Sequence, residues 1–166
     1  MRTLIVLLLI SSILFIFLYK PRITGFVSNM TIERFENFFF VYERMRYPAR
    51  VQITEKGETL NIGISVDPWN LDFGVLPKGV NNKRFINLAN HKNKIYKVSL
   101  VSRGNISSMI SFSENNFLLH EGEEKKVSVF LNSSLSEKVG NYTGEVDVTY
   151  KRARFSPLNF LIEVME

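Results

Sequence analysis

The sequence predicts an all-β fold, an antiparallel β-sandwich of seven to eight short strands that follows one N-terminal transmembrane helix. Three observations predict it. Thr3 to Tyr19 form a run of seventeen residues without a charge, whereas from Val51 onward apolar side chains recur at every second position. Turn-forming residues interrupt this alternation about every 8–12 residues, which is the strand spacing of a sandwich. No helical pattern of ten residues interrupts the strands, which excludes an α/β architecture.

The composition restricts the function classes. The chain has 166 residues, no cysteine and a formal net charge of +5. The lack of cysteine excludes disulfides, thiolate zinc sites and a cysteine nucleophile. Residues 20–50 hold six basic and three acidic side chains, whereas residues 51–166 hold fourteen and thirteen. Nucleic-acid-binding domains concentrate Lys and Arg on the folded body. We therefore expect no nucleic-acid partner, and the basic excess fits a stalk beside acidic lipid headgroups.

Residues 1–22 are predicted to form a membrane anchor that contacts lipid through residues 3–19. A helix of this length spans roughly 25 Å, and the basic side chains at its two ends can snorkel across the rest of a bilayer core of about 30 Å. A cleaved signal peptide is the competing interpretation, but its apolar region is about 7–15 residues long and small residues follow it. Here only Gly25 offers a cleavage position, so we expect an uncleaved anchor.

The orientation of the anchor depends on weak signals. Positive charges flank both ends of the apolar run, so the positive-inside count is nearly even. Four triplets match the acceptor pattern for N-glycosylation, at Asn29, Asn105, Asn132 and Asn141. We therefore expect the N-terminus on the cytoplasmic side of the cell membrane and the β-domain on the outer side.

Residues 23–60 are an aromatic and basic juxtamembrane segment. Aromatic and Met side chains recur in it at three- and four-residue spacing, which predicts a helix over about residues 31–46. Thr31 is a suitable N-cap for this helix and Pro48 a suitable stop. It would lie in the membrane interface with its arginines facing phosphates. The alternatives are that the aromatic stripe packs on the domain, or that residues 38–42 form a strand.

Residues 61–166 are predicted to form the sandwich. Within it, segments of alternating apolar and polar residues are separated by turns that contain polar residues and glycine. Val51 and Ile53 already alternate before the boundary. The predicted strands lie at residues 62–66, 85–90, 96–100, 110–112, 117–119, 127–131, 146–150 and 160–164. The Cys…Trp…Cys core of antibody domains is missing, so the sandwich depends on its apolar core alone.

Four segments carry a family resemblance. They are ISVDPWNLDFGVLPKG (residues 64–79), FINLANH (85–91), FLLHEGEEKKVSVFL (117–131) and VGNYTGEVDV (139–148). Their order resembles the immunoglobulin-like domains of the Hydin and major-sperm-protein type, which also occur on prokaryotic surface proteins. The likeness covers residues 62–164 and implies an immunoglobulin-like sandwich on a prokaryotic, in particular archaeal, membrane-anchored surface protein. It implies no catalytic residue.

The motifs of this resemblance are turn and core positions. Phe73 is expected in the core, and Gly74 permits a bend after it. Asn90 is expected to cap a strand end by bonding to its own turn. Tyr142 resembles a tyrosine-corner residue, with a buried ring and a hydroxyl bonded to backbone a few residues upstream. Trp69 is either a binding-face aromatic or, as we favour, a lid on the core. The full structural set is Pro68, Phe73, Gly74, Asn90, Gly122, Gly140, Tyr142 and Gly144.

The sequence predicts no enzyme, cofactor or metal site. His91 and His120 are the only histidines, and a zinc site needs more ligands than these two. Both are predicted to be exposed turn residues. Glutamates crowd residues 121–124 without the spaced oxygen ligands of a calcium loop. The basic run at residues 151–154 keeps a sheet end soluble or holds an acidic partner.

These observations predict a membrane-anchored extracytoplasmic module that is not catalytic and contacts a protein or an envelope polymer. One alternative is an accessory subunit of a membrane-embedded filament or secretion machine, because such subunits also combine one N-terminal helix with a sandwich. The prepilin version is disfavoured, since no Lys/Arg-Gly processing site precedes the apolar run. The alternative from another class is an envelope hydrolase. It would require paired acids in a cleft, which the sequence does not show.

Overall fold

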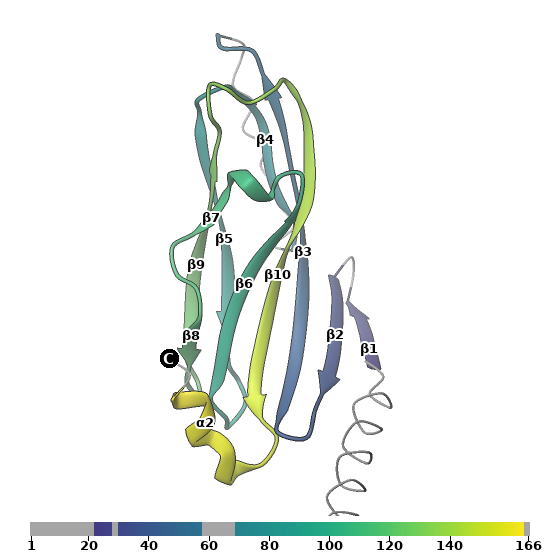
Figure 1. Ribbon diagram of the computed structural model, residues 1–166, viewed down its shortest axis with the longest axis vertical. Coiled ribbons are helices and arrows are strands. Elements are labelled where there is room, and N and C mark those ends of the chain that lie inside the picture. The colour runs from purple at the N-terminus through teal and green to yellow at the C-terminus, as the bar shows by residue number, and fades with distance from the viewer. Residues whose placement is uncertain (1–21, 28–29, 58–68, 165–166) are drawn as a thin grey trace, which may run out of the picture.

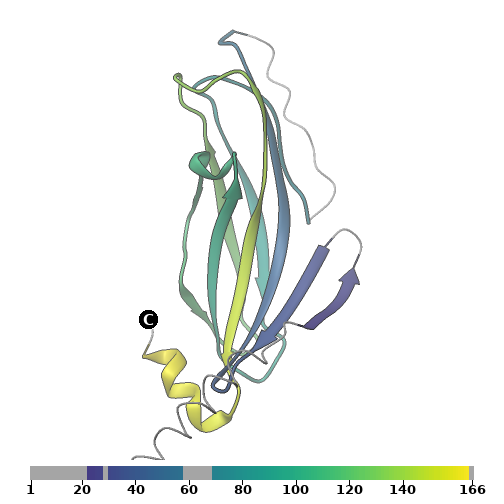
Figure 2. The same cartoon turned by 45° about the vertical axis from the view of Figure 1, so that its right-hand side comes forward.

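Two β-sheets pack face to face in the computed structural model, which describes residues 22–27, 30–57 and 69–164 (Figures 1 and 2). The larger sheet has seven strands in the order β1-β2-β3-β10-β6-β8, with β4 paired to β3 outside this path, and the smaller has the order β5-β9-β7. The all-β sandwich prediction is confirmed for the described residues, with ten strands rather than seven to eight. The strands are β1 (Arg22–Val27), β2 (Met30–Glu36), β3 (Phe40–Thr54), β4 (Leu71–Pro77), β5 (Asn81–Ala89), β6 (Tyr96–Gly104), β7 (Ile110–Phe112), β8 (Phe117–Leu119), β9 (Glu124–Asn132) and β10 (Gly140–Ala153).

The pairing of β3 with β10 is the longest in the structure. The two strands run antiparallel with fourteen residue pairs, from Phe40 opposite Ala153 to Ile53 opposite Gly140. On its other edge β3 changes partner. It pairs antiparallel with β2 over residues 41–45 and parallel with β4 over residues 49–54. Pro48 lies between these two stretches and has no N–H to donate to a ladder.

The helix predicted over residues 31–46 is wrong. These residues form β2, the turn at residues 37–39 and the first part of β3. The Asn37 side-chain oxygen accepts hydrogen bonds from the backbone N–H groups of Phe39 and Phe40, at 3.0 and 2.7 Å, and so holds the turn. Pairing with β10 overrides the helical spacing of the aromatics, because sheet context outweighs local preference. The strand alternative for residues 38–42 is correct from Phe40 onward.

The β-sandwich extends across the boundary predicted at residue 61. Four buried side chains of β3 belong to its core: Tyr47, Ala49, Val51 and Ile53. The residues between them (48, 50 and 52) are exposed, so one face of β3 points between the sheets. The strand predicted over residues 160–164 is also wrong. A 3-10 turn (Ser156–Leu158) leads into the short helix α2 (Asn159–Glu163), which buries Ile162 but leaves Phe160 and Val164 exposed.

The core lies between the two sheets, where apolar side chains from β3, β4, β6 and β10 meet those from β5 and β9. Phe73 of β4 is fully buried in it. Trp69 packs against the edge of this core, and its ring lies 6.0 Å from that of Tyr47. The apolar run predicted to contact lipid (residues 3–19), the strand predicted at residues 62–66, Pro68 and Asn29 lie outside the described residues. Among the helices that the structure describes, none has the length and apolar character needed to cross a membrane.

Asn90 ties the two sheets together at one end of the sandwich. It is 3% exposed, and its side-chain NH₂ group donates to the carbonyl oxygens of Lys94, Leu119 and His120 at 2.6, 3.1 and 2.9 Å. Its side-chain oxygen accepts the backbone N–H of Lys92 at 3.0 Å, which is a bond to its own turn. Asn90 follows β5 of the smaller sheet, whereas Leu119 ends β8 of the larger one. One buried amide therefore joins loops of both sheets.

Removing β3 should prevent folding. A fragment of residues 60–166 lacks the long partner of β10 and four core side chains, so we expect no cooperative unfolding transition. A fragment of residues 22–166 should show β-type circular dichroism and a single urea transition. Circular dichroism and urea melts of both fragments measure this difference. A cooperative melt of residues 60–166 would show that β3 is dispensable.

Replacing Asn90 with Asp should destabilise the sandwich. The carboxylate has nearly the same shape but no donor, so three carbonyl oxygens would face a negative charge. We expect the free energy of unfolding at pH 7 to fall by about 2–4 kcal/mol. Because the pKa of this new carboxyl would be raised in the folded state, the loss should shrink as the pH falls toward about 4. Urea melts at several pH values measure it, with Asn93→Asp in the same exposed loop as the matched control, which should stay near wild type.

Candidate interaction surfaces

An open groove of about 440 Å³ lies on the outer face of the larger sheet. It forms where β3, β4 and β10 run side by side, because β4 and β10 pair with opposite edges of β3. Its polar side chains point away from the core, since they alternate with buried residues along β3. The lining residues are Arg50, Val51, Gln52, Asp72, Gly74, Val75, Asn141, Tyr142 and Thr143. We call this surface the distal groove.

An ion pair fixes one wall of the distal groove. Nε and Nη2 of Arg50 both donate to one carboxylate oxygen of Asp72, at 2.9 and 2.6 Å. The other oxygen of Asp72 accepts the backbone N–H of Gly74 at 2.9 Å. Partial burial raises the pKa of Asp72, but the hydrogen bonds from Arg50 and Gly74 and the charges of Arg50 and Arg84 lower it more. The pKa of Asp72 therefore lies below its usual value, which favours the charged form of the pair.

A bulge in β4 shapes the same wall. Arg50 pairs with Asp72 and Gln52 with Val75, so β4 uses one residue more than β3 between these positions. Gly74, within the bulge, has a φ of +81°, which glycine adopts without strain. The bend predicted for Gly74 is present, and it lets the Asp72 side chain bond to the backbone two residues on.

A second charged cluster spans four strands of the larger sheet. Asp147 of β10 points to the outer face, yet its side chain is only 3% exposed because three arginines cover it. Its nearest partner is Nε of Arg103, at 2.9 Å, while Nε of Arg44 and of Arg46 lie 3.9 and 3.8 Å away. Glu33 of β2 accepts a hydrogen bond from Arg46 at 2.8 Å. This cluster could not be predicted from the sequence, because an acidic residue between Val146 and Val148 predicts only an outward position and not its burial.

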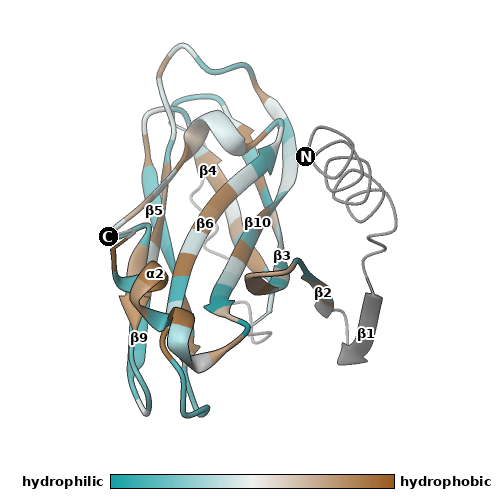
Figure 3. Cartoon of the chain, turned by 60° about the horizontal axis from the view of Figure 1, so that its bottom comes forward, coloured by the Kyte–Doolittle hydropathy of each residue, from teal (hydrophilic) through white to brown (hydrophobic). Residues whose placement is uncertain are grey.

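Exposed phenylalanines gather at the other end of β3. Phe38 and Phe39 lie in the turn between β2 and β3, whereas Phe155 and Phe160 lie beyond the end of β10. They are 63, 48, 50 and 55% exposed. Figure 3 shows the hydrophobic colouring of this turn and of α2 at the end that faces the viewer. We call the surface formed by these four residues the phenylalanine end.

The structure places the predicted structural residues as follows. Gly144 of β10 lies opposite Gly104 of β6, and a Cβ atom on Gly144 would clash with the carbonyl oxygen of Arg103. Glycine is therefore required for the close approach of these two strands. Gly122 lies in the turn between β8 and β9, and Gly140 begins β10. Oη of Tyr142 donates to the carbonyl oxygen of Lys138, four residues upstream, at 2.8 Å. The bond has the predicted form, although the Tyr142 ring is partly buried rather than buried.

The three described sequon asparagines are exposed. The side-chain oxygen of Asn105 accepts the N–H of Thr143 at 2.7 Å, and the NH₂ group of Asn132 donates to the Ser111 hydroxyl at 2.9 Å. Asn141 lines the distal groove. His91 and His120 are exposed at turns, as predicted. Within the described part of the chain, no three metal-ligating side chains lie together.

No family model, curated protein or solved structure matches this chain.

Replacing Asp72 with Asn should weaken the sandwich in a pH-dependent manner. The folded pKa of Asp72 is lowered, so its contribution is present above about pH 4 and is lost as the pH falls through the folded pKa. We expect Asp72→Asn to lower the free energy of unfolding by about 0.5–1 kcal/mol at pH 7. The difference from wild type should shrink as the pH falls below about 4. Urea melts across this range test it, with Glu55→Gln as control, because Glu55 is a more exposed carboxylate in a pair with Lys78. An unchanged difference at pH 2 and pH 7 would contradict the charge argument.

Proposed function

We propose that this chain is a membrane-anchored, extracytoplasmic immunoglobulin-like module that is not catalytic and contacts a protein or an envelope polymer through the distal groove. The observation that carries the proposal is the distance between the distal groove and Arg22, the residue at which β1 begins. The first residue of β1, Arg22, pairs with Arg34 of β2, close to the turn at residues 37–39. Arg50 lies ten residues beyond Phe40 along β3, which at about 3.3 Å per residue is about 33 Å away.

This separation suits a module that presents a binding surface away from a membrane. A segment anchored through residues 3–19 would hold the sandwich at the level of Arg22 and leave the distal groove facing outward. The two-sheet architecture and the hydroxyl bond of Tyr142 support the immunoglobulin-like assignment. The exposure of Asn105 and Asn132, which lie outside the distal groove, is compatible with glycosylation on an outside face.

The chemistry of the distal groove supports a polar partner. Arginine has five N–H donors, and the two bonds from Arg50 to Asp72 use two of them. The side-chain amides of Gln52 and Asn141 add donors and acceptors, and the Thr143 hydroxyl adds both. Such a surface can bind the hydroxyl groups of a polysaccharide or the backbone of an extended peptide.

Site-specific photo-crosslinking in living cells tests the proposal. The full chain carries p-benzoylphenylalanine in place of Gln52, and in the control in place of Asn87, which is exposed on β5 of the smaller sheet. We expect a crosslinked product from position 52 that position 87 does not give, and Arg50→Ala should reduce its yield several-fold. Digestion of the product with proteases or glycosidases identifies a protein or a polymer.

Equal yields from positions 52 and 87, or a chain absent from the membrane fraction, would overturn the proposed function. A product that contains a filament or secretion subunit would favour the alternative of an accessory subunit. Protease treatment of intact and of lysed cells measures on which side of the membrane the sandwich lies.

A further inference from the structure

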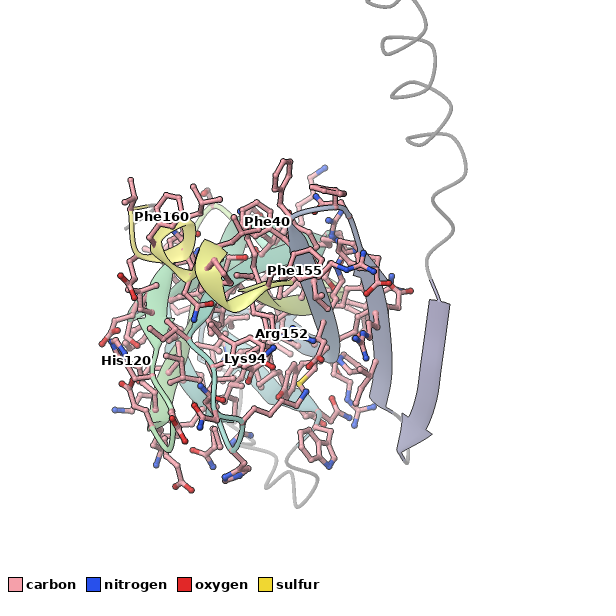
Figure 4. The ribbon with its side chains drawn as sticks, turned by 90° about the horizontal axis from the view of Figure 1, so that it is seen from below. Phe40, Lys94, His120, Arg152, Phe155 and Phe160 are labelled. Atoms are coloured by element: carbon pink, nitrogen blue, oxygen red, sulfur yellow. The ribbon has the colours of Figure 1, made fainter. Side chains whose placement is uncertain are left out.

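Hydrogen bonds and packing connect the segments of the phenylalanine end to the sandwich, although its rings are exposed. The N–H of Arg154 donates to the carbonyl oxygen of Phe39 at 2.8 Å, which ties the β2–β3 turn to the end of β10. Phe38 and Phe39 pack edge to face with their ring centres 5.0 Å apart. Ile162 is fully buried and holds α2 against the sandwich, so that Phe160 faces outward. Figure 4 shows Phe155 and Phe160 at this end, seen from below. The exposed rings therefore lie on segments that are bonded to or packed against the sandwich.

The register of β1 and β2 places Arg22, the first residue of β1, close to the phenylalanine end. Arg22 lies opposite Arg34, three residues before the turn at Asn37. Three residues of strand span about 10 Å. The 21 residues that precede Arg22 therefore join the sandwich near the phenylalanine end and not near the distal groove. A membrane segment at residues 3–19 leaves only residues 20 and 21 before β1, so the bilayer surface must lie close to these rings.

The charges around the rings are suited to a lipid surface. Two basic side chains lie over aromatic rings at this end. Nζ of Lys151 is 3.9 Å from the centre of the Phe40 ring, and the guanidinium of Arg154 is 5.8 Å from the centre of the Phe155 ring. Arg154 lies 3.7 Å from Glu36, and Lys92 bonds to Glu43 at 3.0 Å. The glutamates of residues 121–124 belong to the turn after β8, and Figure 4 shows neighbouring His120 at the lower left of this end, apart from the labelled Phe155 and Phe160. The surface that suits a bilayer is therefore the half formed by the β2–β3 turn and α2.

We propose that the phenylalanine end inserts its rings into the headgroup region of the bilayer that holds the anchor, so that the sandwich stands on the membrane with the distal groove about 30 Å above it. Aromatic rings are favoured at the boundary between headgroups and acyl chains, and neighbouring basic side chains can contact phosphates. The inference rests on the proposed function, because it takes residues 3–19 as the membrane anchor.

The lack of native cysteine allows a direct test with single labels. The full chain carries Phe39→Cys or Phe160→Cys, labelled with the fluorophore NBD, in vesicles of phosphatidylcholine and phosphatidylglycerol that contain nitroxide-labelled lipid. Lys56→Cys, in the exposed turn at the other end of β3, is the matched control. We expect quenching at positions 39 and 160 to be several-fold stronger than at position 56. Circular dichroism confirms that the three variants fold alike.

Flotation of the vesicles separates the two hypotheses. A chain that does not float with the vesicles would refute the anchor, and with it the proposed function. A chain that floats but is quenched equally at positions 39, 160 and 56 would overturn the docking inference alone, and would leave a protein or a second copy of the chain as the occupant of the rings. In a further variant, Phe38→Ser, Phe39→Ser and Phe160→Ser together should reduce the quenching of a label at Phe155→Cys several-fold, while flotation persists.

Discussion

The antiparallel pairing of β3 with β10 is the constraint on which the rest of the structure depends. Its fourteen residue pairs join segments about 100 positions apart, so the chain must close a long loop before the pairing contributes to stability. Every other strand of the larger sheet is attached to this pair. β2 and β4 add to β3, β6 adds to β10, and β1 and β8 follow at the edges. Both candidate surfaces lie at the ends of the same ladder.

The buried Asp147 shows how the register of this ladder is specified. Asp147 lies opposite Arg46, and its cluster with Arg44, Arg103 and Glu33 joins β2, β3, β10 and β6. Such a cluster adds little net stability, because removing the charges from water offsets much of their attraction. A slip of one residue, however, would turn Asp147 into the core and Val146 and Val148 toward solvent. The cluster and the apolar face therefore select the same alignment.

Strands with one clean apolar face could be predicted from the sequence, and β3 could not. In β9, Val127, Val129 and Leu131 alternate with polar residues, and the structure buries all three. The outer face of β3 carries aromatic and arginine side chains, whose spacing also suits a helix. The choice between the two depends on partners in β10, which a local pattern does not contain. The distal groove was missed for the same reason, since Arg50 and Asp72 are 22 positions apart and meet only through the parallel pairing of β3 with β4.

The length of β3 links the two surfaces mechanically. A single strand of fifteen residues, about 50 Å long, reaches from the phenylalanine end to the distal groove, and its pairing with β10 stiffens it along nearly its whole length. At the lower end Asn90 joins the loops of both sheets, so the second sheet follows the first. The uninterrupted pairing of β3 with β10 therefore connects the two ends of the sandwich without a break in the ladder. The orientation of the phenylalanine end therefore determines the direction in which the distal groove faces. A bilayer that binds the rings would thereby hold the groove facing away from the membrane.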